Sequence, residues 1–196
     1  MKKNCIFVTG PESSGSTLIA KVINEALCNQ SWNGRGFNCC DDPRCDIENG
    51  YMAPCQPKES LVCHRSLPFD DSWPPIAEWN KFYTPKYVIC TRDSNVCRVS
   101  QLSRFKWKDD ETLANEKKKA VGILNELIYD KDIPTFIWSY ETYILLDKVY
   151  LHLLADFLEI PRHCFDKITP PLNGNLKYIS NSTSNKNSFI SKMFRK

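Results

Sequence analysis

The stretch that decides the fold is CIFVTGPESSGSTLIAKVINEAL, residues 5–27. Its first five residues are mostly apolar or β-branched and end at Gly10, which is typical of a strand buried inside a parallel sheet. From Ser16 onward, apolar residues recur three and four positions apart, and this period predicts a helix over residues 16–27 with one buried face. A strand, a short glycine-bounded loop and a helix therefore follow one another without a gap.

The loop between these elements is GPESSGST, residues 10–17. Its spacing is that of a phosphate-binding P-loop, G-x4-G-K-[ST], with a serine where the lysine would stand. Glycines let backbone N–H groups turn inward to form an anion-binding nest, and the positive end of the following helix dipole adds to it. The candidate anion-binding residues are Gly10, Ser13, Ser14, Gly15, Ser16 and Thr17. The same residues also fit a plain strand-to-helix turn with capping serines.

The missing lysine bears on the chemistry. In kinases and ATPases that lysine supports the terminal phosphates, while magnesium is held by the loop hydroxyl and by an aspartate. The closest segment to such an aspartate strand is VICTRD, residues 88–93, which places an arginine before the aspartate. The sequence therefore disfavours ordinary ATP hydrolysis and favours transfer of a group with less negative charge, without a metal.

The rest of the chain alternates between strand and helix patterns. We expect strands at 61–63, 86–91 and 135–139, and helices at 74–82, 94–106, 111–129 and 143–158. This alternation predicts a three-layer α/β/α fold with a central parallel sheet. We expect one domain over residues 1–180, with an irregular, cysteine-rich insertion at about 28–59 and a polar, flexible tail at 181–196.

Composition excludes several classes of protein. The 196 residues carry 26 basic and 23 acidic side chains, a balance that does not indicate a nucleic-acid partner. No apolar run reaches the ~18 residues of a membrane span, and the run after Lys3 is too short for a signal peptide. We therefore expect a soluble, cytoplasmic protein with reduced thiols. In an oxidising compartment, Cys39, Cys40, Cys45 and Cys55 could pair. No Cys-x-x-Cys pair occurs, so we predict no metal site.

Two segments together carry a family resemblance. The loop GPESSGST looks like the Gly-x-x-[Arg/Lys]-Ser-Gly-Thr-Thr motif, with Ser13 in the basic position, and a later strand ends in Arg92, eight residues before Ser100. In these features the chain resembles the sulfotransferases that use 3′-phosphoadenosine 5′-phosphosulfate (PAPS), a metal-independent branch of the P-loop fold. The resemblance implies that the loop holds the 5′-phosphosulfate, and that Arg92 and Ser100 hold the 3′-phosphate.

Weaker matches follow in the same order as in that family. LVCHRSLP, residues 61–68, looks like its second strand, which carries a catalytic histidine; WSYE, residues 138–141, and FLEIP, residues 157–161, look like a later strand and helix end. The resemblance implies that His64 takes the acceptor's proton and that Arg65 neutralises the sulfonate. It also implies that Tyr140 and Lys177 contact the nucleotide, within a late loop at 173–178.

The implied reaction moves a sulfuryl group from PAPS to a hydroxyl or amine of a small molecule or glycan, leaving 3′-phosphoadenosine 5′-phosphate (PAP). Two departures keep other functions open: the loop lacks its basic residue, and Glu12 adds a negative charge. We expect compensation from Arg65, Lys106 or Lys177. The alternatives are a small P-loop nucleotide kinase or hydrolase, and a degenerate P-loop module that binds a nucleotide without catalysis.

Overall fold

A four-stranded parallel sheet forms the centre of the molecule. The computed structural model describes residues 3–27, 61–68, 83–129, 132–168 and 173–178. The strands run in the order β2-β1-β3-β4. They are β1 (Lys3–Pro11), β2 (Leu61–Leu67), β3 (Tyr83–Thr91) and β4 (Thr135–Ser139). All three pairings are parallel, as the alternation of strand and helix patterns predicted.

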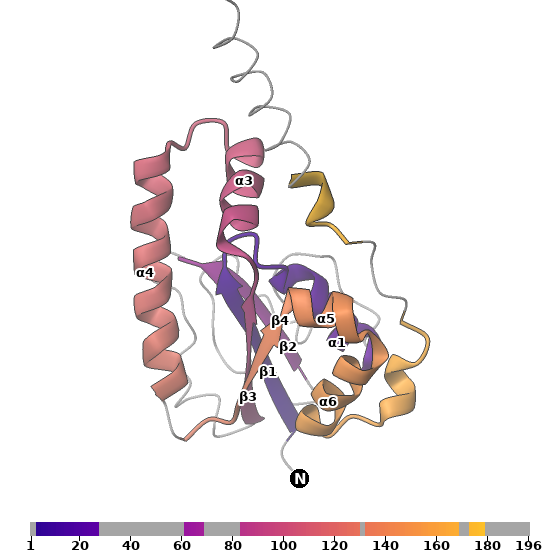
Figure 1. The fold of residues 1–196 in the computed structure, drawn as a ribbon. Helices are drawn as coiled ribbons and strands as arrows, with labels where there is room; N and C mark the ends of the chain where they lie inside the picture. The colour runs from indigo at the N-terminus through magenta and orange to yellow at the C-terminus, as the bar shows by residue number, and fades with distance from the viewer. Residues whose placement is uncertain (1–2, 28–60, 69–82, 130–131, 169–172, 179–196) are drawn as a thin grey trace, which may run out of the picture.

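Helices cover both faces of this sheet. They are α1 (Ser16–Ala26), α3 (Ser94–Arg104), α4 (Asp110–Tyr129), α5 (Tyr140–Leu146) and α6 (Lys148–Leu158), followed by the short 3₁₀ helix η3 (Arg162–Phe165). Figure 1 shows α3 and α4 on one side of the sheet and α1, α5 and α6 on the other. The predicted three-layer α/β/α fold is therefore confirmed.

The helix predicted over residues 143–158 is wrong in one respect, because the structure has two helices there. The chain enters α5 at Tyr140 and breaks at Asp147, whose φ of 48° lies in the left-handed region. The new helix α6 begins at the next residue. The helical period of the apolar residues continues across Asp147. The sequence pattern therefore gave no sign that the positive φ of this one residue divides the helix in two.

The core lies where the sheet is covered on both faces. The residues from Cys5 to Val8 in β1 are fully buried, which is why this strand reads as a continuous apolar run. On the β4 side, Trp138 stacks on Tyr150 with ring centroids 4.6 Å apart. Cys63 and Cys90 are also buried, and burial raises the pKa of the Cys90 thiol. These strand cysteines therefore pack as small apolar side chains.

Parallel strands put the carboxyl ends of β1, β2, β3 and β4 at one edge of the sheet. The connection from β1 leads outward to β2 on one side, whereas β3 and β4 lie on the other side. The order of the strands thus reverses between β1 and β3, and ligands of open α/β sheets bind in the crevice at such a switch point. The loop at 10–17 and Arg92 both lie at this point, at the ends of two hydrogen-bonded neighbours.

Three further predictions fall on residues outside the described ranges: the insertion at 28–59, the helix at 74–82 and the tail at 181–196. Among the helices of the described ranges, none is both long and apolar enough to cross a lipid bilayer.

Candidate functional site

The loop at residues 10–17 packs too closely for larger side chains at its glycines. A Cβ atom on Gly10 would lie 2.4 Å from the backbone oxygen of Cys90, on the neighbouring strand. Gly15 has a φ of 89°, and a Cβ there would lie 3.2 Å from Cδ2 of Tyr140. Ser13 also takes a left-handed φ, 69°. The two glycines of the P-loop spacing therefore meet a steric requirement of this fold.

Polar groups of the loop are left for a ligand. Gly15 is the N-cap residue of α1 and makes no side-chain cap hydrogen bond to that helix end. Ser14 is 1% exposed, and the hydroxyls of Ser13 and Ser14 are buried without a hydrogen-bond partner in the described part of the chain. Buried hydroxyls are almost always partnered in proteins. Together with the positive end of α1, these donors fit an anion such as a phosphate or sulfonate.

Arg92 joins three segments that are far apart in the sequence. Its Nη1 donates to the backbone oxygen of Ser13 at 3.1 Å, and its Nε donates to Oδ1 of Asn175 at 2.8 Å. The guanidinium carbon lies 4.4 Å from the ring centroid of Tyr140 and 5.7 Å from that of Tyr178. The P-loop, the end of β3 and the late segment 173–178 therefore meet around one fixed cation.

Ser100 reaches the same region from α3. Its hydroxyl is buried and donates to the phenol oxygen of Tyr178 at 3.1 Å. Burial raises the pKa of the Tyr178 phenol, but the hydrogen bond from Ser100 and the charges of Lys177 and Arg92 outweigh it and lower the pKa overall. The Lys177 ammonium lies 4.7 Å from the Tyr178 ring centroid. Arg92 and Ser100 therefore both lie against the side chain of Tyr178.

The late segment is held by a polar network whose key members the sequence did not identify. Glu141 Oε1 accepts from the backbone N–H of Asp93 at 3.0 Å and from Nδ2 of Asn175 at 2.9 Å. The backbone N–H of Gly174 donates to the Tyr140 hydroxyl at 3.1 Å. Glu141 and Asn175 do fall within the segments WSYE and 173–178 that the resemblance singled out. Their mutual contact, across 34 residues, has no signal in a single sequence.

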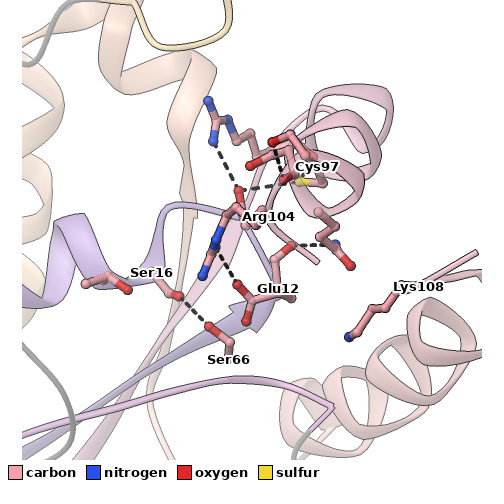
Figure 2. Close-up of polar contacts among 12 residues, drawn as sticks. Glu12, Ser16, Ser66, Cys97, Arg104 and Lys108 are labelled. Atoms are coloured by element: carbon pink, nitrogen blue, oxygen red, sulfur yellow. Dashed lines mark hydrogen bonds and ion pairs between the residues drawn. The ribbon is translucent and has the colours of Figure 1, made fainter. Parts of the chain in front are cut away.

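His64 lies on the other flank of the loop. Its Nε2 is 2.9 Å from Oγ of Ser16 and 3.5 Å from Oγ1 of Thr17. Ser16 Oγ is in turn 3.5 Å from Oγ of Ser66, as Figure 2 shows. Burial, and to a lesser degree the charge of Arg65, lowers the pKa of His64 to about 4. The imidazole is therefore neutral at pH 7, and its lowered pKa makes it a weaker base than a free histidine.

Arg65 does not share the surroundings of His64. Successive side chains of a strand point to opposite faces, so His64 and Ser66 face α1, whereas Arg65 and Leu67 face the α4 layer. The backbone oxygen of Arg65 accepts a hydrogen bond from the Thr9 hydroxyl at 2.8 Å, which fixes β2 against β1.

The negative charge of Glu12 is compensated by a residue that was not predicted. Arg104 Nη1 lies 2.8 Å from Oε1 of Glu12 (the two residues are labelled in Figure 2). Gln101 Nε2 donates to the backbone oxygen of Glu12 at 2.9 Å. The sequence pointed instead to Arg65, Lys106 or Lys177. It also extended α3 to residue 106, whereas the helix ends at Arg104, and this places Arg104 in the last turn beside the loop.

A cavity of about 490 Å³ opens beside the loop, between α3, α4 and the carboxyl ends of β1, β2 and β3. Ser14 and Arg92 line it at the loop, and Leu67 lines it from β2. Because Leu67 and His64 point to opposite faces of β2, the cavity lies on the flank of the loop opposite His64.

Comparisons with known proteins place the chain in no family. No protein-family model matches it, and no curated protein matches its sequence. One solved structure that it resembles is an unliganded sugar kinase from Janibacter sp. HTCC2649, with a TM-score of 0.43 and 10% sequence identity, over 84% of this chain and 98% of that chain. Similarity at this level does not bear on the activity.

Proposed function

We propose that this protein is a sulfotransferase that moves the sulfuryl group of PAPS to a hydroxyl or amine of an acceptor. The observation that supports this most is the position of Arg92. Its guanidinium is 3.1 Å from the backbone of the phosphate loop, and it shares the Tyr178 side chain with Ser100. One anion site at the loop and a second at Arg92 and Ser100 suit a donor that carries phosphate at both its 5′ and 3′ positions.

In this proposal the loop residues hold the 5′-phosphosulfate through backbone N–H groups and serine hydroxyls. Arg92 has five N–H donors, and its two hydrogen bonds to described residues leave the others for the 3′-phosphate. A planar guanidinium can donate two parallel bonds to a phosphate. The Ser100 hydroxyl would exchange its bond to Tyr178 for one to the same phosphate. Tyr140, packed on Arg92 and on Gly15, keeps the two anion sites at a fixed separation.

The transfer itself forms one bond and breaks one. The acceptor oxygen or nitrogen bonds to sulfur, the bond between sulfur and the 5′-phosphate oxygen breaks, and PAP leaves with the electron pair. In this proposal His64 takes the proton that the acceptor loses, although burial lowers its pKa to about 4 and so weakens it as a base. The fixed donors of the loop stabilise the charge that builds on the bridging oxygen, and such preorganised donors are usually the largest contribution to catalysis.

A second candidate is a module that binds a nucleotide without transferring a group. It is favoured by Ser16, which stands where a P-loop lysine would be and contacts His64. A kinase or hydrolase of the same fold is the third.

Thermal unfolding with 3′-phosphoadenosine 5′-phosphate, with ATP and magnesium, and without ligand separates these candidates. A ligand that binds only the folded state raises the Tm by mass action. We expect stabilisation by PAP and none by ATP with magnesium. Equal stabilisation by both would favour the nucleotide-binding module. Stabilisation by ATP with magnesium alone would overturn the sulfotransferase proposal.

A further inference from the structure

We propose that Ser16 is a nucleophile, and that it takes the sulfuryl group from the donor before the acceptor does. The transfer then passes through a sulfate ester of Ser16, in two steps instead of one. This inference rests on the proposed function, which supplies the donor. It is carried by the contact between Ser16 and His64, by the place of Ser16 at the start of α1 and by the burial of Ser16.

Ser16 and His64 form a hydrogen-bonded pair of hydroxyl and imidazole. Oγ of Ser16 lies 2.9 Å from Nε2 of His64, which is the separation expected between an activated nucleophile and its base. With its own proton on Nδ1, the imidazole accepts the Ser16 proton at Nε2. The neighbouring Thr17 is exposed, and its hydroxyl is 3.5 Å from the same nitrogen. Ser16 is therefore the better placed of the two hydroxyls.

The backbone places the Ser16 hydroxyl where the transferred group is expected. Ser16 stands at the P-loop position whose lysine reaches the outer phosphates of a nucleotide, and in PAPS the outer group of the 5′ chain is the sulfuryl group. Ser16 is also the first residue of α1, so the positive end of the helix dipole stabilises an alkoxide there. Because Ser16 is 2% exposed, bulk water is kept from its ester.

The bound donor strengthens His64 as a base. Burial, and to a lesser degree the charge of Arg65, lowers the pKa of His64 to about 4. An anion held by the loop lies close to the imidazole, because the loop residue Ser16 contacts Nε2 directly. A negative charge beside a histidine favours the protonated ring. The imidazole therefore gains basicity when the phosphosulfate is in place, which is when the Ser16 proton has to leave.

Both steps are substitutions at sulfur, and their atoms and charges balance. In the first, Oγ of Ser16 bonds to sulfur, the bond between sulfur and the 5′-phosphate oxygen breaks, and PAP leaves with the electron pair. His64 takes the Ser16 proton and releases it to solvent. In the second, the acceptor oxygen or nitrogen bonds to sulfur and the bond between sulfur and Oγ breaks. His64 takes the acceptor's proton and passes it to Oγ, which restores Ser16.

The test looks for a sulfuryl group on the protein in the absence of any acceptor. The full chain is mixed with PAPS and denatured, and its peptides are analysed by mass spectrometry for an added SO₃ group. Exchange of labelled PAP into PAPS is measured in parallel, because a reversible covalent step allows it without acceptor, and a further arm replaces PAPS by ATP with magnesium. The variant is Ser16→Ala. Its matched control is Ser66→Ala, whose hydroxyl lies 3.5 Å from that of Ser16 (Figure 2).

We expect the natural chain to carry the sulfuryl group on Ser16 and to exchange PAP into PAPS. Ser16→Ala should lose both properties, and Ser66→Ala should keep both. His64→Asn should slow the labelling about 100-fold or more, which is the usual contribution of a general base. Calorimetry should show that PAP still binds to all of these chains.

Three results would overturn the inference while leaving the proposed function standing, provided that PAP binds. They are a natural chain with neither label nor exchange, a label on a residue other than Ser16, and an unchanged label in Ser16→Ala. The first two are read on the natural chain, so they decide even if Ser16→Ala does not fold. Conversely, if ATP with magnesium leaves a phosphoryl group on Ser16 while PAP does not bind, Ser16 is the nucleophile and the proposed donor is wrong.

Discussion

Two neighbouring strand-to-helix junctions of this protein differ in whether a side chain caps the first N–H groups of the helix. Both β1 and β3 end at the same edge of the sheet, and each is followed by a helix. At the start of α3, one carboxylate oxygen of Asp93 accepts from the backbone N–H groups of Asn95 and Val96, both at 2.9 Å. At the start of α1 stands Gly15, whose left-handed backbone offers no side chain to the helix end.

The difference shows which helix end is available to a ligand. The carboxylate of Asp93 satisfies the free N–H groups of α3 and neutralises the positive end of its dipole. The N–H groups of α1 have no such cap among the described residues, so an anion can take its place. Arg92, one residue before the Asp93 cap, donates a hydrogen bond to the backbone oxygen of Ser13 at the uncapped junction. One junction supplies a nest of N–H groups and the other supplies a fixed cation.

The largest expected effect comes from removing that cation. Arg92→Ala should weaken PAP binding about 1,000-fold, or about 4 kcal/mol, because hydrogen bonds to charged groups contribute about 1.5–3 kcal/mol each and at least two would be lost. Calorimetric titration with PAP measures the effect. The matched control is Arg162→Ala, which removes a guanidinium paired with Asp156 after α6. Loss of less than about tenfold, or an equal loss in the control, would contradict the assignment of Arg92 to the 3′-phosphate.

The second effect concerns His64, which contacts the first residue of the uncapped helix. Its pKa is about 4 in the folded protein and 6.5 in the unfolded chain. As the pH falls through 6.5, the unfolded chain takes up a proton that the folded protein does not, so the free energy of unfolding decreases. The decrease is on the order of 3 kcal/mol by pH 4. In denaturant unfolding from pH 7.5 to pH 4, the free energy of unfolding should decrease about 3 kcal/mol less in His64→Asn than in the natural chain.

His163→Asn, which changes an exposed histidine in η3, is the control and should keep the pH dependence of the natural chain. The same His64→Asn variant also tests the proposed proton transfer. Its turnover should fall while its affinity for PAP stays the same. Unchanged turnover would remove His64 as the proton acceptor without affecting the stability result.

The smallest expected effect comes from uncapping the second helix. Asp93→Ala should lower the free energy of unfolding by about 1 kcal/mol, the usual contribution of an N-cap. Asp93→Asn, which keeps an oxygen able to accept from the backbone, should lower it by only a few tenths. Denaturant unfolding at neutral pH compares the three chains. Equal destabilisation by both substitutions would mean that the charge of Asp93, rather than its capping oxygen, stabilises the junction.

Local pattern was sufficient for the strands, because burial on both faces of a parallel sheet requires an unbroken apolar run, as in Cys5–Val8. It was insufficient at Asp147, where one positive φ angle divides the predicted helix in two. It also failed for the partner of Glu12, because Arg104 and Lys106 are both basic and only the end of α3 selects between them.

The sequence by itself determined the layered α/β fold and the position of the glycine-bounded loop at residues 10–17. Both depend on residues close together in the chain, where the period and the glycine spacing fix the local geometry. Arg92 and Ser100 became candidates through the family resemblance. Only the tertiary structure decided that Asn175 and Glu141 hold the late segment against Arg92, and that His64 and the cavity lie on opposite flanks of the loop. Those relations arise because parallel strands bring their carboxyl ends to one edge of the sheet. Residues that are far apart in the sequence become neighbours there.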